Sequence, residues 1–225
     1  MKTKSFLLIA ILWNSLMFCQ SSIKINKSQV RLFAVTPLNY EIKRVNGLAL
    51  GLGYDPKYLF KDDDLTEMQT VNGLNLEINP LGLLYWLFYD PQKFENAEYI
   101  KMNGLNLSLA GYTRGISHNG ISISMYNYGY SMNGLMGSLF SFEIEKGKGV
   151  FLATLKVSSK EMKGISMAAF NDSEVMRGVQ LGLYNRNSNG KGLQLGLVNK
   201  SKKMKGLQIG FWNKNEKRTL PIINF

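Results

Sequence analysis

The chain has 225 residues, of which 45% are hydrophobic and 12% aromatic, so it holds enough apolar material for one globular domain and is not a disordered tail. Its 22 glycines against 5 prolines favour β-structure with many tight turns over a helical bundle. The formal net charge is +11, and one histidine and one cysteine exclude most nucleophile–base pairs and nearly all zinc or copper sites.

The first residues have the pattern of a secretory signal peptide, with Lys2 and Lys4 before an apolar run over residues 6–18. This run is interrupted and shorter than the ~20 apolar residues of a membrane-spanning helix. We therefore expect residues 1–19 to be removed by cleavage near Cys19. Lipid attachment at Cys19 is the second interpretation, which the bulky residues before it disfavour. The cleaved chain then has no cysteine for a disulfide, and its charge falls to about +9.

A short motif that begins at a glycine recurs along most of the remaining chain. Each copy continues as an alternation of apolar and other residues, which is typical of a short β-strand. The predicted repeat array covers residues 45–213, between an N-terminal lead-in at 20–44 and a C-terminal cap at 214–225. Its unit glycines are Gly47, Gly73, Gly104, Gly120, Gly134, Gly149, Gly164, Gly178, Gly192 and Gly206.

Two insertions, at residues 54–70 and 79–101, separate the first three units. The first insertion holds the acidic run 62–64, which lacks the spaced oxygen ligands of a calcium loop and better suits the N-terminus of a helix. The second holds the apolar stretch 81–89, which is too short to span a membrane as a helix. We expect this stretch to cover the first coils, with contact at a membrane interface as the second interpretation.

The later units follow one another at intervals of 14 to 16 residues, and the last four begin 14 residues apart. The pattern Gly-Leu-Gln-Leu-Gly-Leu-x-Asn, or a close variant, is clearest in three of these four, and the copy that begins at Gly164 is more divergent. These four copies run over residues 164–171, 178–185, 192–199 and 206–213.

The alternation within a unit predicts which side chains are buried. Leu181, Leu195 and Ile209 occupy the same place in successive units, and we expect this row to face the core. Most unit glycines are also preceded, two places earlier, by an apolar residue, which in a regular strand would point to the face opposite to that of the apolar row. A positive φ or a bulge at the glycine would be needed to turn both the row and this residue inward. The unit asparagines are expected to form a ladder that bonds the backbone of the next coil: Asn127, Asn171, Asn185, Asn199 and Asn213.

Two all-β architectures are compatible with this pattern. The favoured one is a parallel β-solenoid of ~14-residue coils, in which equivalent residues stack ~4.8 Å apart. The alternative is an outer-membrane antiparallel β-barrel, which the terminal Phe225 supports. Spanning strands need ~9 to 11 residues, whereas the alternation here lasts about seven. The connections are also uniform in length, and Pro221 disfavours a laddered last strand.

The motif at 178–185, 192–199 and 206–213 resembles that of a family of bacterial exported surface-repeat proteins. Residues 214–225 are similar to the tail of that family. The resemblance covers about residues 40–225 and is most specific from residue 164 onward. It implies export and surface display, and it implies no reaction, since it brings no catalytic residues.

The residues themselves indicate no catalytic, cofactor-binding or metal site. His118 lies in a predicted connection between units, where we expect a solvated loop histidine. The glycine-rich units match neither a nucleotide-binding loop nor the calcium-binding nonapeptide. We therefore expect no enzyme activity and no cofactor.

The expected function is that of an exported non-enzymatic repeat scaffold or binding module of the bacterial cell envelope, at the cell surface, outer membrane or periplasm. An integral outer-membrane protein is the alternative. Nucleic acid is excluded as a partner by export. The basic charge suits anionic envelope components, such as lipopolysaccharide or acidic glycans, another surface protein, or association with a membrane. Lysines that only keep the turns soluble are the simpler interpretation.

Overall fold

The computed structural model describes residues 30–38, 41–53, 68–79, 98, 100–112 and 115–225. The predicted signal peptide at 1–19, the acidic run at 62–64 and the apolar stretch at 81–89 lie outside these residues.

The described chain forms one eight-stranded sheet whose strands follow one another in chain order. This confirms the prediction of an all-β fold. No helix in the described residues is long and apolar enough to cross a membrane. The strands are β1 (Val30–Thr36), β2 (Arg44–Gly51), β3 (Gln69–Glu77), β4 (Ile100–Ser108), β5 (Ile116–Ala153), β6 (Lys156–Met167), β7 (Phe170–Lys214) and β8 (Thr219–Asn224).

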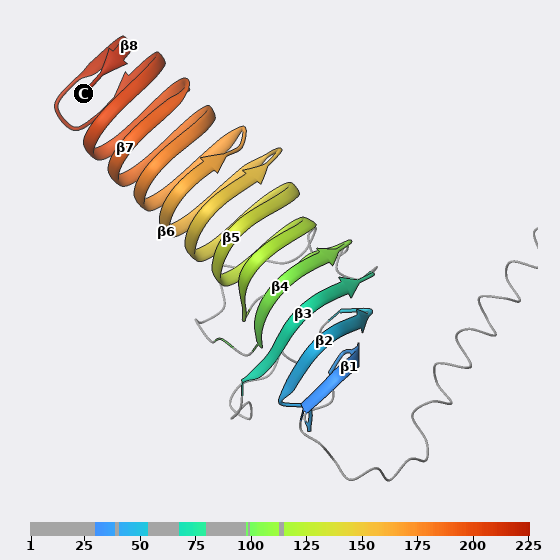
Figure 1. The fold of residues 1–225 in the computed structure, drawn as a ribbon. Helices are drawn as coiled ribbons and strands as arrows, with labels where there is room; N and C mark the ends of the chain where they lie inside the picture. The colour runs from blue at the N-terminus through green and yellow to red at the C-terminus, as the bar shows by residue number, and fades with distance from the viewer. Residues whose placement is uncertain (1–29, 39–40, 54–67, 80–97, 99, 113–114) are drawn as a thin grey trace, which may run out of the picture.

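Strands β1 to β7 pair in parallel, and only β8 pairs antiparallel with its neighbour β7. A straight strand with the 45 residues of β7 would be about 150 Å long. The chain instead winds into successive coils that stack along one axis, from β1 at one end to β8 at the other (Figure 1). The sheet is open, so the architecture is solenoid-like, and the alternative of a closed antiparallel sheet is wrong.

The unit glycines lie beside one another on successive coils. Gly73 pairs with Gly47 and Gly104, and Gly164 pairs with Gly149 and Gly178. All ten have φ between +121° and +149°, a region that L side chains rarely adopt. A Cβ atom on any of them would lie well under 3.0 Å from a backbone oxygen of the preceding coil. Glycine is therefore required by both the conformation and the close approach.

The direction of the apolar row in each unit differs from the prediction. Leu181 and Leu195 are half-buried and Ile209 is exposed, so this row lies on the outer face rather than in the core. The alternation continues through the positive-φ glycine without a change of parity. The residue two places before the glycine is buried in every unit except the last, where Met204 is half-buried. The residue two places after the glycine is buried in all ten: Ala49, Asn75, Asn106, Ser122, Met136, Phe151, Ser166, Gln180, Gln194 and Gln208.

The interior changes character along the array. In the middle coils it is apolar, and the rings of Phe142 and Phe151 meet edge to face with centroids 5.4 Å apart. In the last coils it contains ladders of amide side chains. Gln208 Nε2 donates to Gln194 Oε1 over 2.7 Å, and Gln194 Nε2 donates to Gln180 Oε1 over 2.8 Å. These amides are buried at low cost because each one is hydrogen-bonded to the next coil.

Two segments assigned to the ends of the array also take part in the sheet. Strand β1 lies within the predicted lead-in and pairs with β2 in the same parallel manner as later strands. Strand β8 lies within the predicted C-terminal cap, where Asn224 Nδ2 donates to Gln208 Oε1 over 3.0 Å. The glutamine ladder therefore continues into β8.

Candidate binding face

The outer side of the array that follows the unit glycines carries mostly apolar side chains, with Gly137 and Thr154 as exceptions. Because the coils pair in register, residues one, three and five places after each glycine form three adjacent columns. We call this surface the apolar face. Its exposed members are Leu50, Leu52, Ile78, Leu105, Leu107, Leu109, Ile121, Ile123, Leu135, Leu139, Leu152, Ile165, Met167, Leu183, Leu197, Ile209 and Phe211.

The apolar face is as large as the largest apolar patch found on an ordinary soluble monomer. Ten coils at ~4.8 Å and five strand positions at ~3.3 Å give a surface of about 45 Å by 13 Å, or about 600 Å². The largest apolar patch of an ordinary monomer is about 300–600 Å², and patches of this size commonly mark an interaction site. Leu183 and Leu197 are 55% and 59% exposed, so these side chains have room to enter a contact.

A row of cations borders the apolar face along the coils of the C-terminal half. The residue immediately before the unit glycine is basic and exposed in five successive coils: Lys148, Lys163, Arg177, Lys191 and Lys205. We call these five residues the basic row. The basic row and the first apolar column both face outward. In each coil the basic residue comes directly before the unit glycine, and the first apolar residue comes directly after it.

The same position holds asparagine in the N-terminal half. Asn72 Nδ2 donates to Asn46 Oδ1, and Asn103 Nδ2 donates to Asn72 Oδ1, each over 2.7 Å. Asn119 and Asn133 extend this ladder with bonds of 2.8 Å. The edge of the apolar face therefore changes from neutral to positive along the array.

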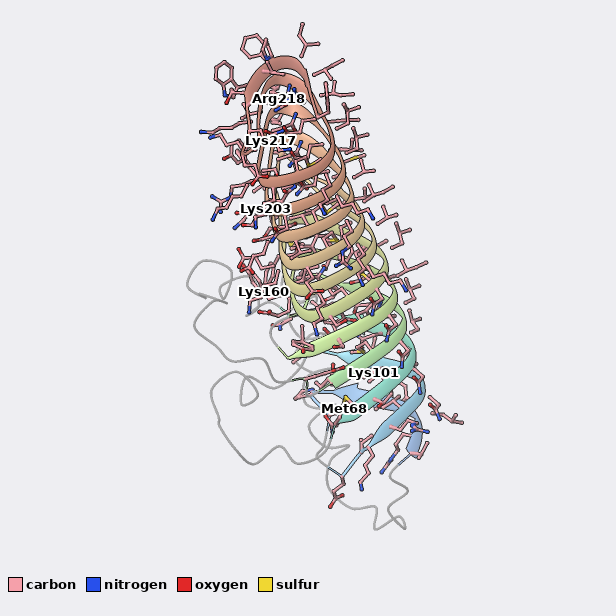
Figure 2. The ribbon with its side chains drawn as sticks, turned by 90° about the vertical axis from the view of Figure 1, so that its left-hand side faces the viewer. Met68, Lys101, Lys160, Lys203, Lys217 and Arg218 are labelled. Atoms are coloured by element: carbon pink, nitrogen blue, oxygen red, sulfur yellow. The ribbon has the colours of Figure 1, made fainter. Side chains whose placement is uncertain are left out.

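Most acidic groups of the later coils lie on the return side, by which we mean the outward residues seven to eleven places after a unit glycine. The exposed Glu161 is the exception, three places before Gly164. Glu145 forms an ion pair with Lys160, and Asp172 forms one with Arg186, each with an N···O distance of 2.7 Å. Figure 2 shows Lys160 and Lys203 along one side of the stacked coils. Among the described residues, no aspartate or glutamate lies in the basic row or on the apolar face.

Asparagines just beyond the apolar face hold successive coils in register. Asn185 Nδ2 donates to the carbonyl oxygen of Leu195 and to Asn199 Oδ1, both over 2.8 Å. Asn199 Nδ2 donates to the carbonyl oxygen of Ile209 over 2.9 Å and to Asn213 Oδ1 over 2.7 Å. Asn171 makes the equivalent bonds to Leu181 and Asn185, and Asn127 is also buried. This ladder fixes the backbone that carries the apolar face.

A separate cluster of titratable side chains lies inside the coils that contain β3, β4 and the start of β5. His118 is 1% exposed, so the prediction of a solvated loop histidine is wrong. It occupies the inward position two residues before Gly120, and its Nδ1 atom lies 2.9 Å from the hydroxyl of Tyr112. Glu77 is also buried, and its carboxylate accepts from Asn75 Nδ2 over 3.0 Å.

Burial governs the charges of this cluster. Desolvation raises the pKa of Glu77 to about 7, against smaller opposing effects of hydrogen bonds from Asn75 and Ser108. Desolvation lowers the pKa of His118 to about 4. The pKa of Tyr112 is raised, first by burial and then by the charge of Glu77. Burial therefore favours the neutral form of all three side chains. We assign a structural role to these buried polar groups.

The opposite shifts of Glu77 and His118 predict a compensated pH dependence of stability. The folded-state pKa of Glu77 exceeds its ordinary value of 4.5. Its contribution to the free energy of unfolding is therefore full below pH 4.5 and is lost as pH rises to 7. The folded-state pKa of His118 lies below 6.5, so its contribution is full above pH 6.5 and is lost as pH falls to 4. Each is worth about 3 kcal/mol, and the two slopes oppose each other between pH 4.5 and 6.5.

We expect Glu77→Gln to remove this compensation. The free energy of unfolding of the variant, measured by urea titration, should rise by about 3 kcal/mol between pH 4 and 6.5, while that of the parent stays nearly level. The exposed Glu161→Gln is the control and should keep the parent profile. A level profile for Glu77→Gln would show that His118 does not titrate as its burial requires.

The described residues contain no group of three or more histidine, cysteine, aspartate or glutamate side chains arranged to hold a metal ion. The glycines, leucines and asparagines that the sequence analysis singled out are brought together as parallel columns, and two of the unit glycines, Gly73 and Gly104, line a small pocket with Tyr112 and His118. Sequence reasoning missed the apolar face because it assumed a change of parity at the glycine. The signal was available in the glutamine two places after it, which has the same parity as the methionine two places before.

Comparison of the chain with protein-family models, with curated proteins and with solved structures gives no match.

Proposed function

We propose that this chain is an exported, non-enzymatic binding scaffold of the bacterial cell envelope, folded as a parallel β-solenoid of about 14-residue coils. The coil length is supported by the asparagine and glutamine ladders, whose bonded partners lie 14 residues apart in sequence. The export signal is the pattern of residues 1–19, and the resemblance to bacterial surface-repeat proteins agrees with display at the envelope.

The observation that carries the binding role is the apolar face beside the basic row. Columns of exposed and half-exposed apolar side chains along the array are costly in water unless another surface covers them. The interior is filled by other residues, so these side chains do not serve the core of the same coil. A scaffold whose coils repeat one surface motif can present a long flat contact area without any catalytic group.

The proposal is tested by measuring how accessible the apolar face is in isolated cell envelopes. Leu197→Cys and the return-side Asn189→Cys are each treated with a water-soluble maleimide, first in envelopes and then after purification. We expect the chain in the envelope fraction, with Leu197→Cys labelled at least tenfold more slowly in envelopes than after purification. Asn189→Cys, which replaces an exposed residue, should react equally in both preparations.

Two results would contradict the proposal. Recovery of the chain in the cytosol with its first residues intact would remove the envelope role. Equal labelling of both cysteines in envelopes would mean that nothing covers the apolar face there. Cys19 is changed to serine in both variants, so that each chain carries a single thiol.

A further inference from the structure

We infer that the surface bound by the apolar face is an anionic lipid membrane, on which the array lies with the basic row at the headgroups. This inference rests on the proposed function and names its partner. The chain would contact the interface of the bilayer without spanning it.

The apolar face suits the boundary between lipid headgroups and acyl chains. Its exposed members are leucine, isoleucine, methionine and phenylalanine, and Phe211 at the last coil is 79% exposed. Because the coils are in register, the three columns run side by side along the array, as contact with an extended partner requires. Interfacial binding scales with the apolar area buried and with the attraction of cations to anionic lipids.

The charge distribution distinguishes a lipid surface from a neutral apolar partner. The five cations of the basic row stand beside the apolar face, and no acid of the described residues interrupts them. Three acids of the same coils, Glu143, Glu145 and Asp172, form ion pairs with Lys156, Lys160 and Arg186 on the return side. The surface that carries the leucines is therefore positive, whereas the opposite surface is partly neutralised. Anionic headgroups complement a positive border of this kind.

A second copy of the chain and a soluble acidic glycan are the competing partners. Two copies packed through their apolar faces would bury leucines but would leave the basic row without an acidic partner on either face. A glycan would match the basic row but would leave the apolar columns in water. A lipid surface satisfies both parts of the site, so we place it first.

The experiment measures binding of the purified protein to vesicles by co-sedimentation. Vesicles of phosphatidylglycerol mixed with phosphatidylcholine are compared with vesicles of phosphatidylcholine alone, at low and high salt. We expect saturable binding to the anionic vesicles, at least tenfold weaker binding to the neutral ones, and loss of affinity as salt rises. All variants keep the same N-terminus, so any lipid contact of residues 1–29 contributes equally to each.

Two double variants test the two parts of the site. Leu183→Ser with Leu197→Ser removes apolar contacts, and Lys163→Gln with Lys191→Gln removes two cations of the basic row. Each pair should lower the affinity for anionic vesicles at least tenfold, since each residue is worth about fivefold. Lys202→Gln with Lys203→Gln removes the same charge from the exposed return side and should lower affinity less than threefold. Circular dichroism verifies that every variant is folded.

Several outcomes would overturn the inference. An equal loss of affinity in the Lys202 and Lys203 pair would show that net charge alone drives binding. A stable dimer in lipid-free solution that dissociates in the leucine variant would identify a second copy as the partner. Binding to a soluble acidic glycan that the leucine variant retains would identify the glycan. Protection of Leu197→Cys in envelopes without any vesicle binding would refute the lipid partner and leave the proposed function standing.

Discussion

Gly192→Ala is expected to lower the free energy of unfolding by about 4 kcal/mol, measured by urea titration. Gly192 has φ +132°, which an alanine adopts only under strain. The added Cβ atom would also lie well under 3.0 Å from the carbonyl oxygen of Gly178, so the two coils would have to separate. That separation would stretch the parallel hydrogen bonds on both sides of the glycine.

Gly137→Ala is the matched control for this substitution. A Cβ atom there would lie 3.8 Å from the carbonyl oxygen of Ser122 and 3.9 Å from the side chain of Ile123, which is ordinary contact. We expect a change within about 0.5 kcal/mol. Hydrogen exchange should show that Gly192→Ala opens the coils next to residue 192 before the others, because each coil contacts only its neighbours. Equal stability of the two variants would mean that the coils can separate without loss.

Asn199→Ala is expected to cost about 4 kcal/mol by the same measurement. The Asn199 side chain is fully buried and bonds the carbonyl oxygen of Ile209 on one side. It also accepts from Asn185 Nδ2 over 2.8 Å on the other side. Truncation leaves buried donors and acceptors on two neighbouring coils without a partner, and each such group costs about 1–3 kcal/mol.

The exposed Asn189→Ala provides the same chemical change outside the ladder and should shift the urea midpoint little. A double-mutant cycle with Asn185→Ala should give a combined cost below the sum of the single costs, because the two residues share one hydrogen bond. Additive costs would show that the asparagines act independently and that the ladder does not couple the coils.

The stacking of the coils could be predicted from the sequence because it depends on positions that other residue types cannot occupy. A glycine recurs at nearly constant intervals, and an asparagine follows seven places later in most of the clear copies. Both are needed where backbones approach closely or where a buried carbonyl needs a donor. Spacing alone therefore favoured a parallel all-β arrangement over an antiparallel one.

The inward and outward directions could not be obtained from hydrophobicity. Leucine at position 195 suggested the core and glutamine at 194 suggested solvent, yet Gln194 is 1% exposed and Leu195 is only half-buried. In a narrow coil, a glutamine that bonds its equivalents above and below has no unpaired polar group, so its burial carries little penalty. The position of His118 was missed for the same reason, since parity with the buried methionines and not polarity decides its direction.

The reversal of direction at β8 bears on how copies of this chain could join end to end. A parallel sheet with two similar edges invites head-to-tail growth into filaments, because each copy can extend the ladder of the next. Here the last coil is covered by an antiparallel strand in which Pro221 has no amide hydrogen and Ile222 has φ 67°. Such an edge offers no continuous row of donors and acceptors. We therefore expect β8 to disfavour polymerisation through this end.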